Sequence, residues 1–134
     1  MTLTHLRPSP VRAWTRAALA IGLACACAVA SAAGWIAVMK NTAAEAFDED
    51  DVHQFLNTAV KTLNAEGPPQ TVDWSNPANG TGGSFLVVGD AAPRQGEPCK
   101  RLRVSVYAPK YPKSTSTWTM CRSPAGRWQL AGVG

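Results

Sequence analysis

The residues of this 134-residue chain with the most distinctive chemistry are four cysteines, Cys25, Cys27, Cys99 and Cys121. Cys25 and Cys27 lie in an uncharged stretch where no carboxylate or histidine stands beside them to complete a metal site. Cys99 and Cys121 lie in the C-terminal half without the CxxC spacing of redox centres. This pattern favours a structural disulfide, and a reduced pair with a redox or metal role is the alternative.

No catalytic constellation accompanies the cysteines. The C-terminal part has one histidine, His53, with no partner at ligand spacing, and the acidic run at residues 48–51 is typical of a solvated helix start. The sequence also lacks a serine in a nucleophile elbow. We therefore expect a protein that is not an enzyme and that uses no cofactor or metal.

Two segments with period-two alternation would position the cysteine pair. Cys99–Ala108 and Ser114–Arg122 each place apolar side chains on one face and polar side chains on the other. If the chain folds back at Lys110, Leu102 faces Trp118 and Cys99 faces Cys121, and a slip of one residue would destroy both matches. We predict a Cys99–Cys121 disulfide on the polar face of a sheet. In the chain-entropy model, a disulfide that closes such a loop stabilises the folded protein by roughly 3 kcal/mol.

The N-terminal part determines where this domain is delivered. Residues 17–39 carry no charge, and at 1.5 Å per helical residue they span roughly 35 Å, enough to cross a bilayer core of about 30 Å. Arg7, Arg12 and Arg16 precede the stretch, so the positive-inside rule places the N-terminus in the cytoplasm and exports the remainder.

Three forms of this segment are open. As a retained transmembrane anchor it would place Trp14 and Trp35 at opposite membrane interfaces. As a signal peptide it would be cleaved after the small residues 30–32. As a lipoprotein signal it would be processed at Cys25 or Cys27, although neither cysteine has the leucine-like residue expected three positions before it.

The rest of the chain predicts one small α+β domain. We assign residues 1–16 to a basic cytoplasmic leader, 17–39 to a transmembrane or signal helix, 40–49 to an acidic linker and 50–134 to the exported domain. An apolar stripe through Phe55 predicts an amphipathic helix from about Asp50 to Ala65. We expect this helix to pack on an antiparallel sheet of about five strands, with Trp74, Trp118 and Trp128 beneath it and with loops at residues 76–83 and 90–98.

Charge is distributed unevenly along the exported part. Residues 41–93 contain 8 acidic and 1 basic side chains, whereas residues 94–134 contain 8 basic and 1 acidic. We expect Lys100, Arg101 and Arg103 to lie beside the disulfide, on the face away from the helix. They form a candidate site for anionic lipids or lipopolysaccharide phosphates. The alternative is that the two halves neutralise one another. The small overall excess of positive charge does not predict nucleic-acid binding.

Three motifs occur in order between Val72 and Trp128. They are Trp74-Ser75-Asn76-Pro77 with Gly80 and Gly83, then Cys99-Lys100, then the run from Cys121 to Trp128. Together they resemble the 17 kDa surface antigen family of bacterial envelope proteins. The resemblance implies a non-catalytic, envelope-exposed domain whose two cysteines pair. The chain lacks the family's glycine-zipper segment, and Ala125 replaces the family's aspartate.

These observations predict a membrane-tethered, non-catalytic cell-envelope protein of surface-antigen type with a structural or interaction role. Its domain would lie in the periplasm or cell envelope, and the outer membrane or cell surface is the alternative location. Expected partners are the membrane, anionic envelope lipids and other envelope proteins. A periplasmic binding module that uses the basic sheet face is the alternative function.

Overall fold

The computed structural model describes residues 34–134 of the chain. Most of the expected anchor or signal segment, including Trp14, Cys25 and Cys27, lies outside these residues, so all three predicted forms of that segment remain predictions. Among the described residues, no helix is both long enough and apolar enough to cross a membrane.

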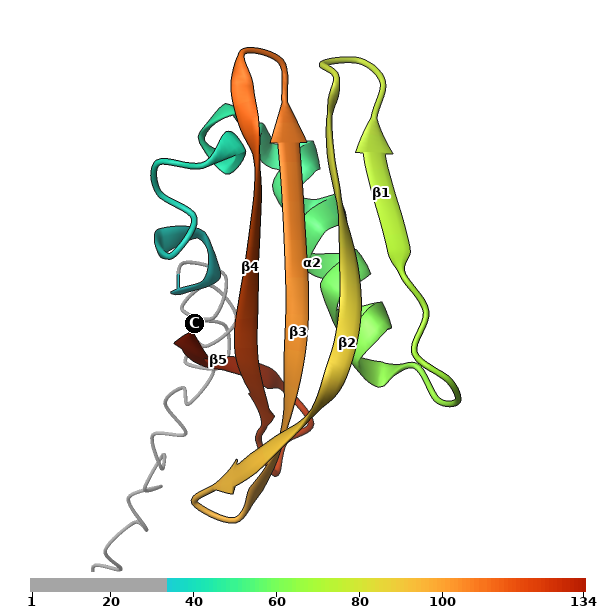
Figure 1. Ribbon diagram of the computed structural model, residues 1–134, viewed down its shortest axis with the longest axis vertical. Coiled ribbons are helices and arrows are strands. Elements are labelled where there is room, and N and C mark those ends of the chain that lie inside the picture. Colours follow the sequence, from blue (N-terminus) through green and yellow to red (C-terminus); the bar gives the residue numbers. More distant parts are fainter. Residues whose placement is uncertain (1–33) are drawn as a thin grey trace, which may run out of the picture.

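The described part folds as one helix packed against an open antiparallel sheet (Figure 1). The five strands follow one another in the order β1-β2-β3-β4-β5, so each strand pairs with its neighbour in sequence. The elements are η1 Ala43–Ala46, α2 Glu49–Asn64, β1 Val72–Asn76, β2 Thr81–Arg94, β3 Glu97–Ala108, β4 Tyr111–Arg122 and β5 Trp128–Val133. The α+β architecture expected for this domain is therefore confirmed.

Helix α2 begins one residue earlier than expected because Asp48 caps it. The Asp48 carboxylate accepts from the Asp51 N–H, and the Asp51 carboxylate accepts from the Asp48 N–H. Such a reciprocal capping box satisfies two helix N–H groups that have no partner within the helix. Phe55, Ala59 and Leu63 form the fully buried stripe that faces the sheet.

The β3–β4 register agrees with the expected one. Leu102 pairs with Trp118 and Cys99 pairs with Cys121, and the strands reverse at Pro109-Lys110, where Lys110 has φ 68°. The expected loop at residues 90–98 is wrong, because β2 and β3 continue through most of it. They turn at Gln95-Gly96, where both residues have positive φ, as tight two-residue hairpin turns require.

The core lies between the sheet and α2, around Phe55. Its ring centroid is 5.0 Å from that of Phe85, 5.9 Å from Trp118 and 6.3 Å from Trp74. Trp128 is also buried, at the other end of the helix, where its Nε1 donates to Asn64 Oδ1 over 2.8 Å. The three tryptophans therefore share the helix-covered face as expected, but they are spread along the helix.

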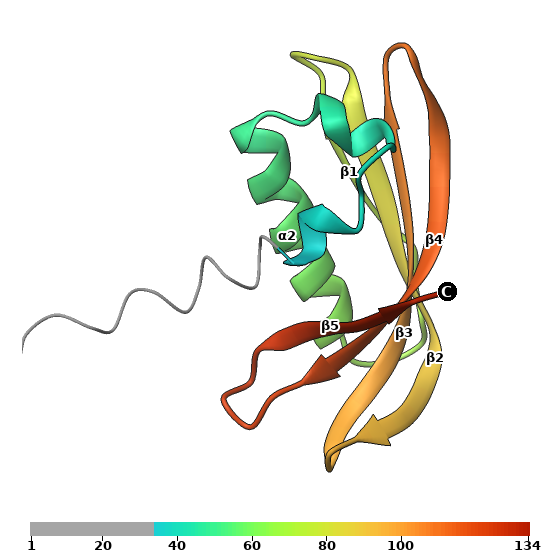
Figure 2. The same ribbon diagram turned by 90° about the vertical axis from the view of Figure 1, so that its left-hand side faces the viewer.

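Residues 34–47 also cover the sheet, which differs from the expected linker at 40–49. Figure 2 shows this segment on the same side of the sheet as α2. Trp35 and Met39 are 3 % and 4 % exposed, and the Trp35 ring meets the Trp118 ring edge-on at 6.1 Å. One helix is too narrow to cover the apolar face of several strands. Trp35, expected at a membrane interface, therefore lies in the domain core, and the packed unit begins before residue 50.

Candidate functional site

The disulfide lies at one end of the sheet, between the two central hairpin strands. Cys99 and Cys121 face each other directly, with their Cα atoms 4.0 Å apart, and they are covalently joined as the register predicted. Both are nearly buried, at 4 % and 3 % exposure. The Arg94 side chain spans this end of the sheet, since its Nη1 donates over 2.7 Å from β2 to the Ala131 carbonyl of β5.

Lys100 does not belong to the predicted anion site. It lies on the helix side of the sheet, where its Nζ donates over 2.8 Å to the Leu63 carbonyl near the end of α2. The same ammonium group lies 5.6 Å from the Trp128 ring centroid. A cation at the C-terminal end of a helix satisfies a free carbonyl and interacts favourably with the helix dipole. Strand alternation explains the correction, because Lys100 shares the face of Leu102.

Arg101 and Arg103 lie on the opposite, outer face of the sheet, and both are exposed. Arg101 pairs with Gly89 of β2 and Thr119 of β4, and Arg103 pairs with Leu86 and Thr117. All four of these cross-strand neighbours are uncharged. The outer face therefore presents two arginines whose charge is not neutralised by an opposing carboxylate in the adjacent strands.

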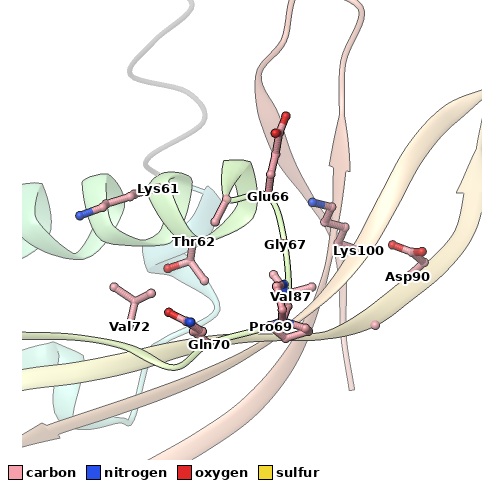
Figure 3. A pocket seen from close by; sticks show the side chains of 13 residues that line it. Lys61, Thr62, Glu66, Gly67, Pro69, Gln70, Val72, Val87, Asp90 and Lys100 are labelled. Atoms are coloured by element: carbon pink, nitrogen blue, oxygen red, sulfur yellow. The ribbon is translucent and has the colours of Figure 1, made fainter.

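A pocket of about 580 Å³ lies between the end of α2, the following loop and strand β2 (Figure 3). Its charged lining residues are Lys61, Glu66, Asp90 and Lys100. Two cations and two carboxylates give the pocket no overall preference for one sign of charge. One N–H of the Lys100 ammonium group already donates to the Leu63 carbonyl, so that N–H is not available to a molecule in the pocket.

The sequence patterns did not predict a buried polar site around Asp51. Asp51 is fully buried, and its carboxylate accepts from Asn76 Nδ2 and from Asn79 Nδ2, both at 2.7 Å. Asn79 Oδ1 in turn accepts from the Thr81 N–H and hydroxyl at 3.0 and 2.8 Å. This network, which we call the Asp51 network, joins the start of α2 to the β1–β2 turn.

Burial alone would raise the pKa of Asp51, because it disfavours the charged carboxylate. Hydrogen bonds from the Asn76 side chain, the Asp48 backbone and the Asn79 side chain outweigh that effect and lower the pKa below its ordinary value. The signal available in the sequence was the Asp48-x-x-Asp51 capping pattern. The asparagine partners lie 25 and 28 residues away, beyond any local pattern.

No cluster of three or more His, Cys, Asp or Glu side chains suited to a metal ion occurs within residues 34–134. His53 lies on the exposed side of α2, with its Nε2 3.9 Å from a carboxylate oxygen of Glu49. Its side chain is 71 % exposed, so it is a surface residue.

The remaining motif residues have structural positions. A Cβ on Gly83 would overlap the Ser105 carbonyl and lie 2.9 Å from Trp74 Nε1, so only glycine allows this close packing of β1, β2 and β3. In the β4–β5 turn, Gly126 has φ 81° and its N–H donates to the Ser123 carbonyl. The turn returns the chain so that Trp128 can reach Asn64.

The fold and the buried cysteine pair define a small, disulfide-linked α+β domain built on an antiparallel meander. Comparison with family models matches residues 61–129, just over half of the chain, to the 17 kDa outer membrane surface antigen family. The chain therefore belongs to this family, as its motifs predicted, and this membership indicates an outer membrane surface protein. Comparisons with curated proteins and with solved structures gave no match.

Proposed function

We propose that this protein is a non-catalytic, membrane-tethered component of the cell envelope with a structural or interaction role. One observation carries the proposal: the family's motif residues are occupied in holding the fold together. Trp74 is in the core, Asn76 binds the buried Asp51, and Cys121 is cross-linked to Cys99. Side chains engaged in this way are not available to bind or transform a substrate.

Two further features support an exported location. Disulfides persist in oxidising compartments such as the bacterial periplasm and are rare in the cytosol. Under the positive-inside rule, the arginines before the apolar stretch favour a cytoplasmic N-terminus and a domain on the other side of the membrane. The apolar stretch then supplies the tether, either as a retained helix or through a lipid on Cys25 or Cys27.

The test is the intact mass of the protein recovered from fractionated cells, before and after reduction. We expect it in the membrane fraction with a gain of about 2 Da on reduction, from one disulfide. A full-length mass supports a retained anchor, and an acylated chain starting at Cys25 or Cys27 supports lipidation. A mass for residues 33–134 would contradict the tether, and a reduced protein in the cytosol would contradict the proposal as a whole.

The outer sheet face supports a second candidate function, the binding of anionic envelope lipids or lipopolysaccharide. The observation in its favour is the exposed pair Arg101 and Arg103 with uncharged neighbours in both adjacent strands. Guanidinium groups form charge-assisted, bidentate hydrogen bonds with phosphate. Lys100 does not contribute to this surface, because it is held against the helix end.

Replacing Arg101 and Arg103 together with serine should abolish binding to phosphatidylglycerol vesicles. The measurement is co-sedimentation of the mature protein, held in neutral phosphatidylcholine nanodiscs so that the N-terminal stretch does not insert into the vesicles. A Lys40→Ser/Lys61→Ser variant removes the same charge from exposed residues outside this face and should bind normally. If the arginine variant binds the vesicles as well as the native protein does, this second candidate function is contradicted.

A further inference from the structure

The outer face carries an ordered array of hydrogen-bonding groups besides its charge. Strand β4 contributes Thr115, Thr117 and Thr119 at alternate positions, and the register places the last two opposite Arg103 and Arg101. Neighbouring strands are about 5 Å apart, and alternate residues of one strand are about 7 Å apart. The strands therefore space the guanidinium-bearing and hydroxyl-bearing side chains as a regular grid, in which the Thr115 hydroxyl is also bonded to the Ser105 hydroxyl at 2.9 Å.

An aromatic side chain extends this grid toward the β3–β4 turn. Tyr107 reaches across β2, and its phenol end occupies the space in which a Cβ on Gly82 would lie. The residue is nevertheless 39 % exposed. Tyr107 therefore lies against the sheet with part of its ring open to solvent.

At the other end of the grid, a glycine of β2 again leaves space for a side chain of β3. The Arg101 guanidinium lies beside Gly89 of β2, with its Nη2 3.1 Å from the place that a Cβ would occupy. Two long side chains of β3 thus rest on glycines of the neighbouring strand. The surface from Arg101 to Tyr107 is about 20 Å long at the usual rise per residue.

We propose that this surface, formed by Arg101, Arg103, Thr115, Thr117, Thr119 and Tyr107, binds an extended oligosaccharide that carries carboxylate or phosphate groups. The inference deepens the second candidate function of the same face, on which it rests. The arginines would bind the acidic groups, the threonines would bond sugar hydroxyls, and the Tyr107 ring would stack on the apolar C–H side of a sugar ring.

The threonines and the tyrosine favour a saccharide over a bilayer surface. Attraction to an anionic bilayer depends on the number of cations near the surface and gains nothing from neutral hydroxyls. Stable docking in the interface also uses exposed apolar side chains that enter the lipid. The described outer face instead offers mostly hydroxyls and a tyrosine lying against the sheet, with Leu86 as a partly buried apolar side chain opposite Arg103.

The test measures binding of the mature protein, in neutral nanodiscs, to polygalacturonate, dextran and phosphatidylglycerol vesicles. Polygalacturonate supplies sugar rings with carboxylates, dextran supplies neutral sugar rings, and the vesicles supply phosphate without sugar rings in an extended chain. We expect clear binding to polygalacturonate and weak binding to dextran. Thr117→Val/Thr119→Val and Tyr107→Ala should each reduce polygalacturonate affinity about tenfold, as the loss of one to two hydrogen bonds or a stacking contact predicts.

Two controls separate recognition from folding and from charge. Tyr107→Phe keeps the ring and should keep most of the affinity, and Lys40→Ser/Lys61→Ser should bind polygalacturonate as the native protein does. The valine variant keeps the shape and the charge, so vesicle binding should not change. If Tyr107→Ala does not fold, the valine variant by itself still tests the saccharide inference.

The results can separate the saccharide inference from the anionic-lipid function on which it rests. Vesicle binding without polygalacturonate binding would overturn the saccharide inference and leave the anionic-lipid function standing. Polygalacturonate binding that survives the valine and alanine substitutions would also overturn it, because charge alone would then account for the affinity. A protein that binds neither polygalacturonate nor the vesicles would contradict both the saccharide inference and the anionic-lipid function.

Discussion

Replacing Cys99 and Cys121 with alanine should lower the free energy of unfolding by about 3 kcal/mol. The disulfide joins residues that are 22 positions apart, and its removal restores the conformational freedom of that loop in the unfolded chain. The domain has little reserve against this loss, because a unit of about 100 residues buries a smaller fraction of its surface on folding than a larger domain does. Urea denaturation followed by tryptophan fluorescence measures the change.

Two comparisons sharpen this experiment. Reducing the native protein should lower its stability by a similar amount, whereas reductant should leave the unfolding midpoint of the Cys99→Ala/Cys121→Ala variant unchanged. A loss well below 1 kcal/mol on removing the disulfide would show that the apolar register, with Leu102 opposite Trp118, suffices to hold the hairpin.

Replacing Asp51 with alanine should cost about 3 kcal/mol of stability, because three partly buried hydrogen bonds lose their charged acceptor at once. The donors are the side-chain amides of Asn76 and Asn79 and the Asp48 N–H that begins α2. The variant also disconnects the helix start from the β1–β2 turn. Asp50→Ala, one residue earlier and exposed, is the matched control and should change stability little.

The same carboxylate should make stability depend on acid pH in a defined direction. The pKa of Asp51 is lower in the folded protein than in the unfolded chain, so its contribution is fully present above the ordinary aspartate pKa. The contribution is lost as the pH falls through the lower pKa of the folded state. Unfolding free energies of Asp51→Asn, measured from neutral pH to below pH 4, should therefore fall less steeply than those of the native protein. Parallel curves would contradict the role assigned to this carboxylate.

The Asp51 network gives a physical meaning to the Trp74–Pro77 motif of the family. Asn76 and Asn79 extend from a tight turn to the carboxylate at the helix start, and Trp74 packs against Phe55 in the core between them. The motif thus fixes the crossing of helix and sheet. The outer face, where Arg103 and Tyr107 lie, takes no part in this network.

The amino-acid sequence by itself determined most of the elements and the pairing of β3 with β4. Apolar alternation, the turn at Lys110 and the cysteine match together defined the β3–β4 register, because only one alignment satisfies all three. The stripe through Phe55 likewise defined the buried side of α2, and the motifs identified the family. These properties are local or follow from period-two and period-3.6 patterns, which a linear chain displays directly.

The tertiary structure alone decided the contacts between elements. That Lys100 binds the end of α2, that Asp51 meets Asn76 and Asn79, and that Trp35 joins the core all depend on how the helix lies across the sheet. A periodic pattern shows which face of an element is buried, but it does not show which residue of another element will lie opposite. The physical reason is that these partners are brought together by the packing of whole apolar faces, which favours burial without specifying individual polar partners.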